Sequence, residues 1–329
     1  MTIRVLATRQ ELPGFGLQRL ADDTEVVFWQ DPAKPGPDEL AAIAPGSTGI
    51  LALGNDPMDA ALMDAAGPSL RVIALASMGF DNVDRAAAAE RGIVVTHTPG
   101  VLAETTADLT FALILAARRR LGAAAASLAR GEWDLFRMND YLGLDIHGAT
   151  VGLIGYGQIG RAVARRAQGF GMRVIHHDPY AADDALSTSV SLETLLAEAD
   201  ILSLHVPLTE ETRHLISHRE LAAMKPTATL VSTSRGGVVD EQALLKAIQE
   251  GGLHSVGLDV FEREPMGEEL SPLVAEPYIV TLPHIGSATD STRAAMVDLA
   301  VDNILDVLQD RPARTPLPGT TAVPGGVHA

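Results

Sequence analysis

The stretch that decides the fold is Val151-Gly-Leu-Ile-Gly155-Tyr-Gly157-Gln-Ile-Gly160-Arg161. An apolar strand leads into three closely spaced glycines, and a helical pattern begins directly after them, as in a Rossmann dinucleotide-binding unit. The first glycine of such a loop makes the tight turn, the second lets the backbone approach the pyrophosphate, and the third lets the helix pack closely on the strand. A glycine turn without a ligand is the weaker alternative. The residues expected to bind the dinucleotide here are Gly155, Gly157, Gln158, Ile159 and Gly160.

The end of the next predicted strand indicates which dinucleotide is bound. Asp178 follows the strand Arg173–His177, and its distance from Gly160 is close to the ~20-residue spacing of the carboxylate that binds the adenosine ribose. A carboxylate accepts hydrogen bonds from both ribose hydroxyls and repels a 2′-phosphate, and Asp183 and Asp184 add to that repulsion. We therefore expect NAD rather than NADP as the cofactor.

Composition and charge exclude several kinds of partner. The chain has 329 residues and a formal charge of −17, which disfavours nucleic acid and anionic lipid as partners. It contains no cysteine, so it has no disulfides and no thiol chemistry, which fits a reducing compartment. The start Met1–Ala7 resembles a strand rather than a signal peptide, and no apolar run reaches the ~20 residues of a membrane span. We expect a cytoplasmic protein with no membrane partner.

Short β-branched runs alternate with Ala- and Leu-rich helical stretches along most of the chain. Such alternation is typical of parallel sheets covered by helices on both faces. We therefore predict an α/β fold of two Rossmann-like, doubly wound parallel-sheet domains with a cleft between them. The predicted strands are Ile3–Ala7, Glu25–Trp29, Gly49–Ala52, Arg71–Ala76, Ile93–His97, Thr150–Ile154, Arg173–His177, Ile201–His205, Thr229–Thr233, His254–Asp259 and Tyr278–Leu282. The helical segments between them include Asp81–Arg91, Arg161–Phe170, Leu192–Glu198 and Glu241–Gln249.

One interruption separates the two units, the long Ala-rich helical region Val101–Leu128, which is broken near Arg118–Gly122. Only the second unit carries the phosphate-binding loop, and the last predicted helix, Thr289–Leu308, could return to the first unit. The expected domains are a flavodoxin-like substrate-binding domain at residues 1–99 plus 290–329 and an NAD-binding Rossmann domain at residues 100–289. The tail Thr315–Ala329 is rich in Pro, Gly and Thr, and we expect a loosely held arm or disorder there.

A first motif after the glycine loop is Val231-Ser-Thr-Ser-Arg235-Gly-Gly-Val-Val-Asp240-Glu241. Arg235 ends a predicted strand, and the paired glycines let a small ligand come close to the backbone. A guanidinium is the preferred group for binding a carboxylate in a fork. The alternative is a surface arginine that pairs with Asp240 or Glu241.

Two further motifs end predicted strands with acidic and imidazole groups. The stretch Gly257-Leu-Asp259-Val-Phe-Glu262-Arg-Glu264-Pro265 gathers carboxylates, which also fits a solvated acidic loop. His284 stands alone after the last strand, and a lone histidine is more often structural than catalytic. Together with Arg235, however, these groups supply what the reduction of a 2-oxo acid needs besides a hydride, because His284 can donate the proton and Glu264 can orient its ring. We expect no metal site.

At these residues the chain resembles the D-2-hydroxyacid dehydrogenase family, over roughly Leu70 to Pro318. Ser77–Asp84 resembles the family's substrate loop, and Thr98–Thr110 resembles its hinge and the following helix. The catalytic residues that the resemblance implies are Arg235, Glu264 and His284, and the substrate-binding ones are Met78, Gly79, Arg235 and His284. The further cofactor-lining residues that it implies are Thr106, His205, Val206, Pro207, Thr212, Thr233, Ser234 and Asp259. Members of the family usually form dimers through the nucleotide domain.

Within the family, Gly131–Phe136 and Leu142–Gly148 resemble the glyoxylate and hydroxypyruvate reductases. Formate dehydrogenases are similar too, but they carry Gln at the position of Glu264. We therefore expect an NAD(H)-dependent homodimer that reduces glyoxylate, hydroxypyruvate or a similar small 2-oxo acid to the D-2-hydroxy acid. Two alternatives stay open: a phosphite dehydrogenase, since those enzymes share the Arg–Glu–His trio, and a corepressor-like binding protein that senses NAD(H).

Overall fold

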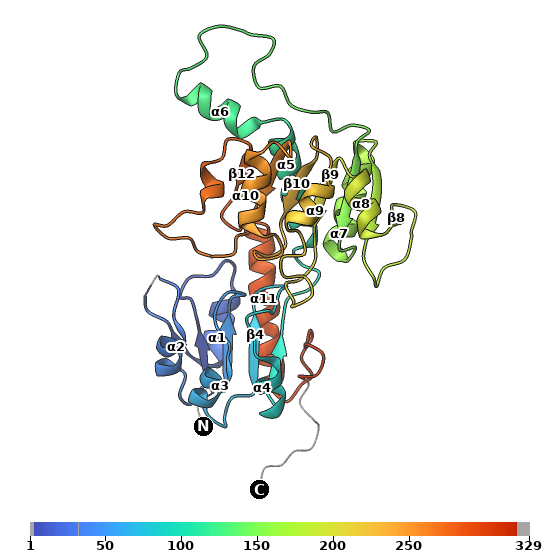
Figure 1. Cartoon of the computed structure of the whole chain (residues 1–329). Helices are drawn as coiled ribbons and strands as arrows, with labels where there is room; N and C mark the ends of the chain where they lie inside the picture. The colour runs from blue at the N-terminus through green and yellow to red at the C-terminus, as the bar shows by residue number, and fades with distance from the viewer. Residues whose placement is uncertain (1–2, 32, 321–329) are drawn as a thin grey trace. The chain divides into compact units, whose positions relative to one another are not determined.

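The structure, a computed structural model, describes residues 3–31 and 33–320 and divides into two compact units (Figure 1). The first unit comprises the chain up to Leu102 and from Ser287 onward, and the second comprises Ala103–Gly286. Each unit is built around a parallel sheet covered by helices, which confirms the predicted α/β class. Among the residues described, no helix combines the length and the apolar character that a membrane crossing requires.

The first unit contains a five-stranded parallel sheet in the order β2-β1-β3-β4-β5. This is the strand order of the flavodoxin-like doubly wound fold. Helices α2, α3 and α4 pack on one face of the sheet, and α1 and α11 pack on the other, each set through its own apolar cluster. The elements are β1 (Arg4–Ala7), α1 (Gly16–Asp23), β2 (Glu25–Phe28), α2 (Pro37–Ile43), β3 (Gly49–Ala52), α3 (Ala60–Ala66), β4 (Val72–Leu75), α4 (Arg85–Glu90), β5 (Val94–Thr96) and α11 (Asp290–Leu308).

Helix α11 and the described residues after it belong to the first unit. Thr289 caps α11 with its side chain, and the helix packs on the apolar face formed by β3 and β4. The segment after α11 lies along the edge strand β5, where the Leu317 N–H donates to Val95 O at 2.8 Å. The expectation of a loosely held tail is therefore wrong for residues 315–320, because an edge strand has unpaired backbone groups that this segment satisfies. The rest of that prediction, residues 321–329, lies outside the described residues.

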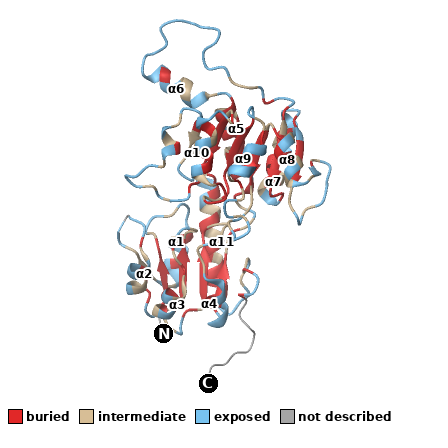
Figure 2. Ribbon diagram, in the orientation of Figure 1, coloured by how far each residue is buried: buried red, intermediate tan, exposed pale blue. Residues whose placement is uncertain are grey.

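The second unit contains a seven-stranded parallel sheet in the order β12-β11-β10-β9-β6-β7-β8. Counted from β6, this is the Rossmann strand order with one strand added at the end. Helices α8, α9 and α10 cover one face and α5 and α7 the other, so the strands are the most buried part of the unit (Figure 2). The elements are α5 (Ala103–Arg118), α6 (Leu121–Ala129), β6 (Thr150–Ile154), α7 (Gln158–Gly169), β7 (Arg173–His177), β8 (Thr188–Ser189), α8 (Leu192–Glu198), β9 (Ile201–Leu204), α9 (His218–Ala223), β10 (Thr229–Ser232), α10 (Glu241–Gln249), β11 (Ser255–Leu258), the 3-10 turn η1 (Pro272–Ala275) and β12 (Ile279–Thr281).

The predicted strands match observed strands to within one residue at either end. The Ala-rich region is two helices because Arg120 adopts φ 55°, a left-handed conformation that separates α5 from α6. The helix predicted from Asp81 begins only at Arg85, since Asp84 accepts the N–H of Ala87 at 2.9 Å and caps it. Strand β8 was not predicted, because its two residues show neither the length nor the apolar alternation of a strand.

Candidate active site

The glycine loop lies between β6 and α7, where the strand order of the second sheet reverses, and open α/β sheets bind ligands at such a point. Gly155 has φ 89°, and a Cβ there would lie 2.7 Å from His205 O. A Cβ on Gly160 would lie 2.4 Å from Gly155 O, so loop and helix touch backbone to backbone. A Cβ on Gly157 would meet no described heavy atom within 4 Å, which leaves the middle of the loop open to a ligand.

Helix α7 and Asp178 both face this loop. No described side chain caps α7 at Gly157, so the amides of its first turn are available to an anion. Asp178, directly after β7, accepts the N–H of Tyr156 at 2.7 Å and that of Tyr180 at 2.8 Å. The structure thus places the predicted ribose carboxylate against the predicted phosphate loop, and these residues fit a bound dinucleotide.

His205 follows β9, and its carbonyl lies against the glycine loop. Its Nε2 is 3.0 Å from Ser203 Oγ, whereas its Nδ1 is buried without a hydrogen-bond partner among the described residues. Burial lowers the pKa of His205 to about 3, so the ring is neutral at pH 7. A buried polar atom without a partner is costly in free energy, and a bound ligand can satisfy it. Val206 and Pro207 continue the turn, and Thr212 Oγ1 donates to Pro207 O at 2.6 Å.

Hydroxyl groups connect α5 to the ends of the neighbouring strands. Thr110 Oγ1 on α5 lies 2.9 Å from Thr233 Oγ1, which follows β10. One turn earlier on the same helix, Thr106 Oγ1 donates to Gly286 O at 3.2 Å. Ser234 is buried beside Thr233. The structure therefore gathers Thr106, Thr233 and Ser234 at the carboxyl edge of the sheet, as a shared cofactor-lining role requires.

Asp259 holds the turn that carries His284. Its side chain is fully buried, and its two oxygens accept the N–H groups of Ile285 and Gly286, each at 2.7 Å. Its backbone carbonyl accepts the His284 N–H at 2.9 Å. Burial raises the pKa of Asp259 to about 6, although the Ile285 amide opposes that rise. His284 has φ 53°, a left-handed conformation that a histidine adopts only when its surroundings hold it there.

His284 and Glu264 form a direct pair. His284 Nδ1 lies 2.5 Å from Glu264 Oε2, and Glu264 Oε1 accepts the N–H of Phe261 at 2.8 Å. With Nδ1 bonded to a carboxylate, that nitrogen carries a hydrogen, and Nε2 is the nitrogen left for proton transfer. The His284 side chain is 45% exposed and that of Glu264 24%, so the imidazole is accessible to a small molecule. This geometry is that of a histidine oriented for acid–base catalysis.

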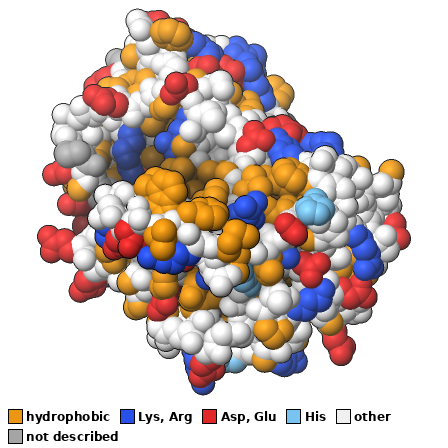
Figure 3. Space-filling model, turned by 90° about the horizontal axis from the view of Figure 1, so that it is seen from above, with side chains coloured by type: hydrophobic (Ala, Val, Ile, Leu, Met, Phe, Trp, Pro, Cys, Tyr) orange, Lys and Arg blue, Asp and Glu red, His pale blue; other side chains and the backbone are white. Residues whose placement is uncertain are grey.

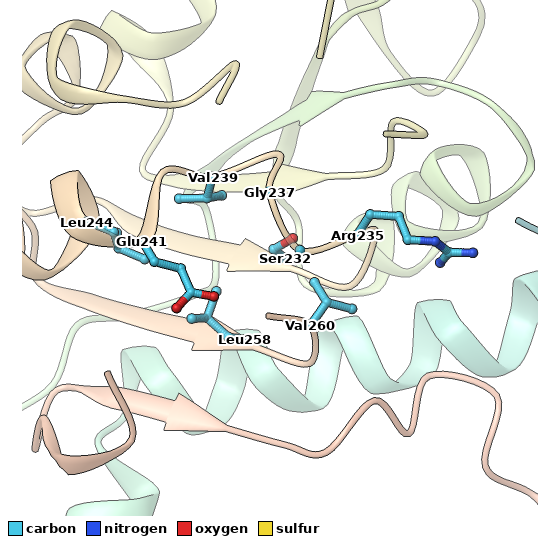
Figure 4. Close-up of a pocket in the computed structure, with 9 residues that line it drawn as sticks. Ser232, Arg235, Gly237, Val239, Glu241, Leu244, Leu258 and Val260 are labelled. Carbon is cyan, nitrogen blue, oxygen red and sulfur yellow. The ribbon is translucent and has the colours of Figure 1, made fainter. Parts of the chain in front are cut away.

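Arg235 follows β10, next to the loop that carries Glu264. A Cβ on Gly236 would lie 1.7 Å from Phe261 O, so the two loops touch and only glycine fits between them. Behind this contact is a small cavity of about 10 Å³, lined by both loops and by α10 (Figure 4), which is room for one water molecule at most. Figure 4 shows the Arg235 side chain directed away from Glu241, which does not favour the alternative of a pair with Glu241.

Met78 and Gly79 lie in the first unit, in the loop after β4. Ser77 Oγ donates to Gly79 O at 2.7 Å, and Thr98 N donates to Ser77 O at 2.8 Å, so the loop is held on both sides. His97 Nδ1 lies 2.8 Å from Met78 O. Sequence reasoning missed His97 as a support of this loop, although its place at the end of a predicted strand was a signal that could have found it.

With this geometry established, comparison with known proteins decides the family. Residues 111–286 match the family described as D-isomer specific 2-hydroxyacid dehydrogenase, NAD binding domain. A protein named glyoxylate reductase from Korarchaeum cryptofilum is 44% identical over 310 residues, which covers 93% of this chain and 92% of the relative. The chain belongs to the D-isomer specific 2-hydroxyacid dehydrogenase family. The family predicted from the motifs is thereby confirmed, and with it an oxidoreductase with a nicotinamide-dinucleotide-binding domain.

Other members of the family agree in sequence and in fold. A protein named glyoxylate/hydroxypyruvate reductase B from Shigella boydii is 41% identical over 305 residues, with 91% of this chain and 93% of the relative covered. A crystal structure of a Thermus thermophilus protein superposes with a TM-score of 0.90 at 46% identity, covering 96% of this chain and 100% of that one. The structure of a Sinorhizobium meliloti glyoxylate/hydroxypyruvate reductase, described as NADPH-dependent and bound to NADP and malonate, has a TM-score of 0.86 at 35% identity, with 98% of each chain covered. The resemblance to the glyoxylate and hydroxypyruvate reductases is confirmed.

Proposed function

We propose that this chain reduces glyoxylate, hydroxypyruvate or a similarly short 2-oxo acid to the D-2-hydroxy acid, with NADH as the hydride donor. The observation that carries the proposal is the 2.5 Å contact between His284 Nδ1 and Glu264 Oε2. The loop that carries Glu264 touches the loop that carries Arg235. The names of the relatives from Korarchaeum cryptofilum and Shigella boydii support a short 2-oxo acid as substrate, and the family's description supports the D isomer.

Each of the three side chains has a distinct role in the proposed reaction. Arg235 binds the substrate carboxylate and polarises the neighbouring carbonyl, as a guanidinium fork suits. A nicotinamide dinucleotide held by the glycine loop and Asp178 would supply the hydride that the carbonyl carbon needs. His284 gives its Nε2 proton to the carbonyl oxygen, and Glu264 stabilises the imidazolium that is ready to donate. The product is the hydroxy acid, and His284 regains its proton from solvent.

Asp178 is the observation that favours NADH over NADPH. Its carboxylate is held against the glycine loop by the N–H groups of Tyr156 and Tyr180, in the position of a ribose-binding acid. A negative charge there repels a 2′-phosphate. The Sinorhizobium meliloti relative is described as NADPH-dependent, so the preference proposed for this chain rests on Asp178 and not on membership of the family.

The first unit is proposed to be the substrate-binding domain. Its loop at Met78 and Gly79 is held by Ser77 and His97, and the two backbone amides of that loop are proposed to bind the substrate carboxylate. The other unit, which carries the glycine loop, is proposed to be the NAD-binding domain.

A homodimer is proposed from the exposed apolar side chains on and after α6. Trp133 is 64% exposed, Phe136 72% and Met138 79%, and Leu121 and Leu128 on α6 are more than half exposed. Figure 3 shows hydrophobic side chains gathered on the face seen in that view. So large an apolar surface is typical of an interface, and a second copy of the chain is the proposed cover. We expect Phe136→Asp with Met138→Asp to shift the sedimentation coefficient from dimer to monomer; a monomeric unmodified chain at micromolar concentration would contradict this.

The proposed function is tested by following NADH oxidation with glyoxylate, hydroxypyruvate, pyruvate, phenylpyruvate and longer 2-oxo acids, and again with NADPH. Turnover of the short acids with NADH supports it. No turnover with any 2-oxo acid, together with NADH binding seen by fluorescence, contradicts it. The assay then turns to the two remaining alternatives, in which phosphite-dependent reduction of NAD indicates a phosphite dehydrogenase and binding without turnover indicates a sensor.

A further inference from the structure

We propose that Asp184 is a second residue, besides Asp178, that makes this chain select NAD(H) over NADP(H), because it holds Arg161 away from a 2′-phosphate. The inference rests on the proposed preference for NAD and deepens it. It concerns the segment between β7 and β8. Asp184 of this segment contacts the side chain of Tyr156 in the glycine loop, whereas Asp178 contacts its backbone N–H.

The carboxylate of Asp184 ties this segment to the glycine loop. Its Oδ1 accepts the N–H of Leu186 at 2.8 Å and that of Ser187 at 3.1 Å, which closes the segment on itself. The hydroxyl of Tyr156 donates to Oδ1 at 2.9 Å, and Arg161 Nη1 donates to Oδ2. Tyr156 belongs to the glycine loop and Arg161 to the first turns of α7. One side chain therefore joins the two parts of the chain that surround the predicted ribose site.

Tyr156 carries the connection to Asp178. Tyr156 is 1% exposed. The His176 ring stacks on the Tyr156 ring with 4.1 Å between the ring centroids, and Arg161 Cζ lies 4.4 Å from the Tyr156 centroid. The Tyr156 backbone N–H donates to Asp178 Oδ2 at 2.7 Å, while its hydroxyl donates to Asp184. Burial and Asp184 raise the pKa of Tyr156 to about 12, so the hydroxyl keeps its proton and stays a donor. Both carboxylates are thus positioned by the same residue.

The charge arrangement disfavours a phosphate near the ribose. Binding a 2′-phosphate requires a cation with free donors, and arginine is the best of them. Arg161 lies over the ring of Tyr156, the residue whose N–H donates to Asp178. Arg161 already forms an ion pair with Asp184. Burial favours the neutral form of Asp184, but the amides of Leu186 and Ser187, the Tyr156 hydroxyl and Arg161 outweigh it and keep the pKa of Asp184 below its ordinary value. The pair is therefore charged at neutral pH, and NADP(H) meets two carboxylates and an arginine that is already paired with one of them.

The experiment compares matched variants by fluorescence titration with NADH and with NADPH. In Asp184→Asn the side-chain oxygen still accepts the amides of Leu186 and Ser187, but the negative charge is gone and Arg161 is released. We expect the ratio of the NADPH Kd to the NADH Kd to fall by about tenfold, the size of one hydrogen bond to a charged group. The matched control is Asp183→Asn, since Asp183 has the same charge but, among the described residues, accepts only the Ser189 N–H, at 2.6 Å. We expect the ratio of the two Kd values to change less than about twofold in this variant.

The double variant Asp184→Asn with Arg161→Ala identifies the cation. If released Arg161 binds the 2′-phosphate, the gain in NADPH affinity disappears in the double variant and shrinks as salt is added. The inference is overturned if Asp184→Asn leaves the ratio unchanged, if Asp183→Asn changes it equally, or if the gain persists without Arg161. Thermal melting checks that each variant is folded, and Asp184→Ser, which keeps a side-chain oxygen for the same amides, replaces Asp184→Asn if that variant unfolds.

The same titrations keep the inference separate from the proposed function. Tighter binding of NADPH than of NADH by the unmodified chain contradicts the proposed preference for NAD. The role of Asp184 is judged instead by how much the ratio of the NADPH Kd to the NADH Kd differs between the variant and the unmodified chain. The proposed preference for NAD and the proposed role of Asp184 can therefore be contradicted independently.

Discussion

Replacing Glu264 by glutamine tests the pair on which the proposed chemistry depends. In the folded chain Glu264 Oε2 lies 2.5 Å from His284 Nδ1, and Oε1 accepts the Phe261 N–H at 2.8 Å. Glutamine keeps the size of the side chain and an oxygen for the Phe261 amide, but it removes the charge that faces the imidazole. The substitution therefore changes the electrostatics of His284 with little change in packing.

The size of the effect follows from this one contact. A hydrogen bond to a charged group contributes about 1.5–3 kcal/mol, and the lower part of that range applies because the His284 side chain is 45% exposed. If that interaction stabilises the transition state, its loss lowers kcat by roughly 10- to 40-fold. The affinity for NADH is expected to stay the same, because Glu264 contacts none of the residues of the glycine loop in the described structure.

The assay measures initial rates of NADH oxidation with glyoxylate, together with the NADH Kd by fluorescence. The matched control is Glu262→Gln, two residues away in the same loop, whose Oε1 lies 3.1 Å from His214 Nε2 and not at His284. The reasoning is refuted if Glu264→Gln keeps kcat within about threefold of the unmodified chain. An equal loss in Glu262→Gln would instead show that the whole loop, rather than the His284 pair, sets the rate.

Three further predictions address the proton donor, the ribose carboxylate and the glycine loop. His284→Ala is expected to lower kcat by about 10²- to 10⁴-fold with the NADH Kd unchanged, and retained turnover would rule out His284 as the acid. Asp178→Ala is expected to weaken NADH binding and to reduce the ratio of the NADPH Kd to the NADH Kd in fluorescence titrations. An unchanged ratio would count against the proposed contact of Asp178 with the ribose. Gly157→Ala is expected to melt like the unmodified chain and to lose only dinucleotide affinity, since its Cβ would meet no described atom, whereas Gly160→Ala, whose Cβ would lie 2.4 Å from Gly155 O, is expected to lower the melting temperature as well. Equal melting temperatures for the two alanine variants would contradict the backbone contact.

Local patterns were sufficient to predict most of the fold. The bounds of β6 and β7 follow from apolar, β-branched runs between turn residues. The glycine loop follows from the positive φ of Gly155 and from the close backbone approach at Gly160. Both depend on interactions between residues close in sequence. The tail after α11 was predicted wrongly because its partner, the edge strand β5, is remote in sequence, and composition alone does not show which backbone groups remain unpaired.

The same division holds for the candidate site. The sequence by itself determined the chemistry available, since it placed an arginine, several carboxylates and a histidine after predicted strands. The sequence already indicated Glu264 as the partner of His284, but only the tertiary structure decided the contact itself: Glu264 Oε2 lies 2.5 Å from His284 Nδ1, while Oε1 accepts the Phe261 N–H. The structure also decided that Tyr156 joins Asp178 to Asp184, through one backbone and one side-chain hydrogen bond. Residue type determines what a group can do, but the distances that allow it depend on strand ends that pack together from distant parts of the chain.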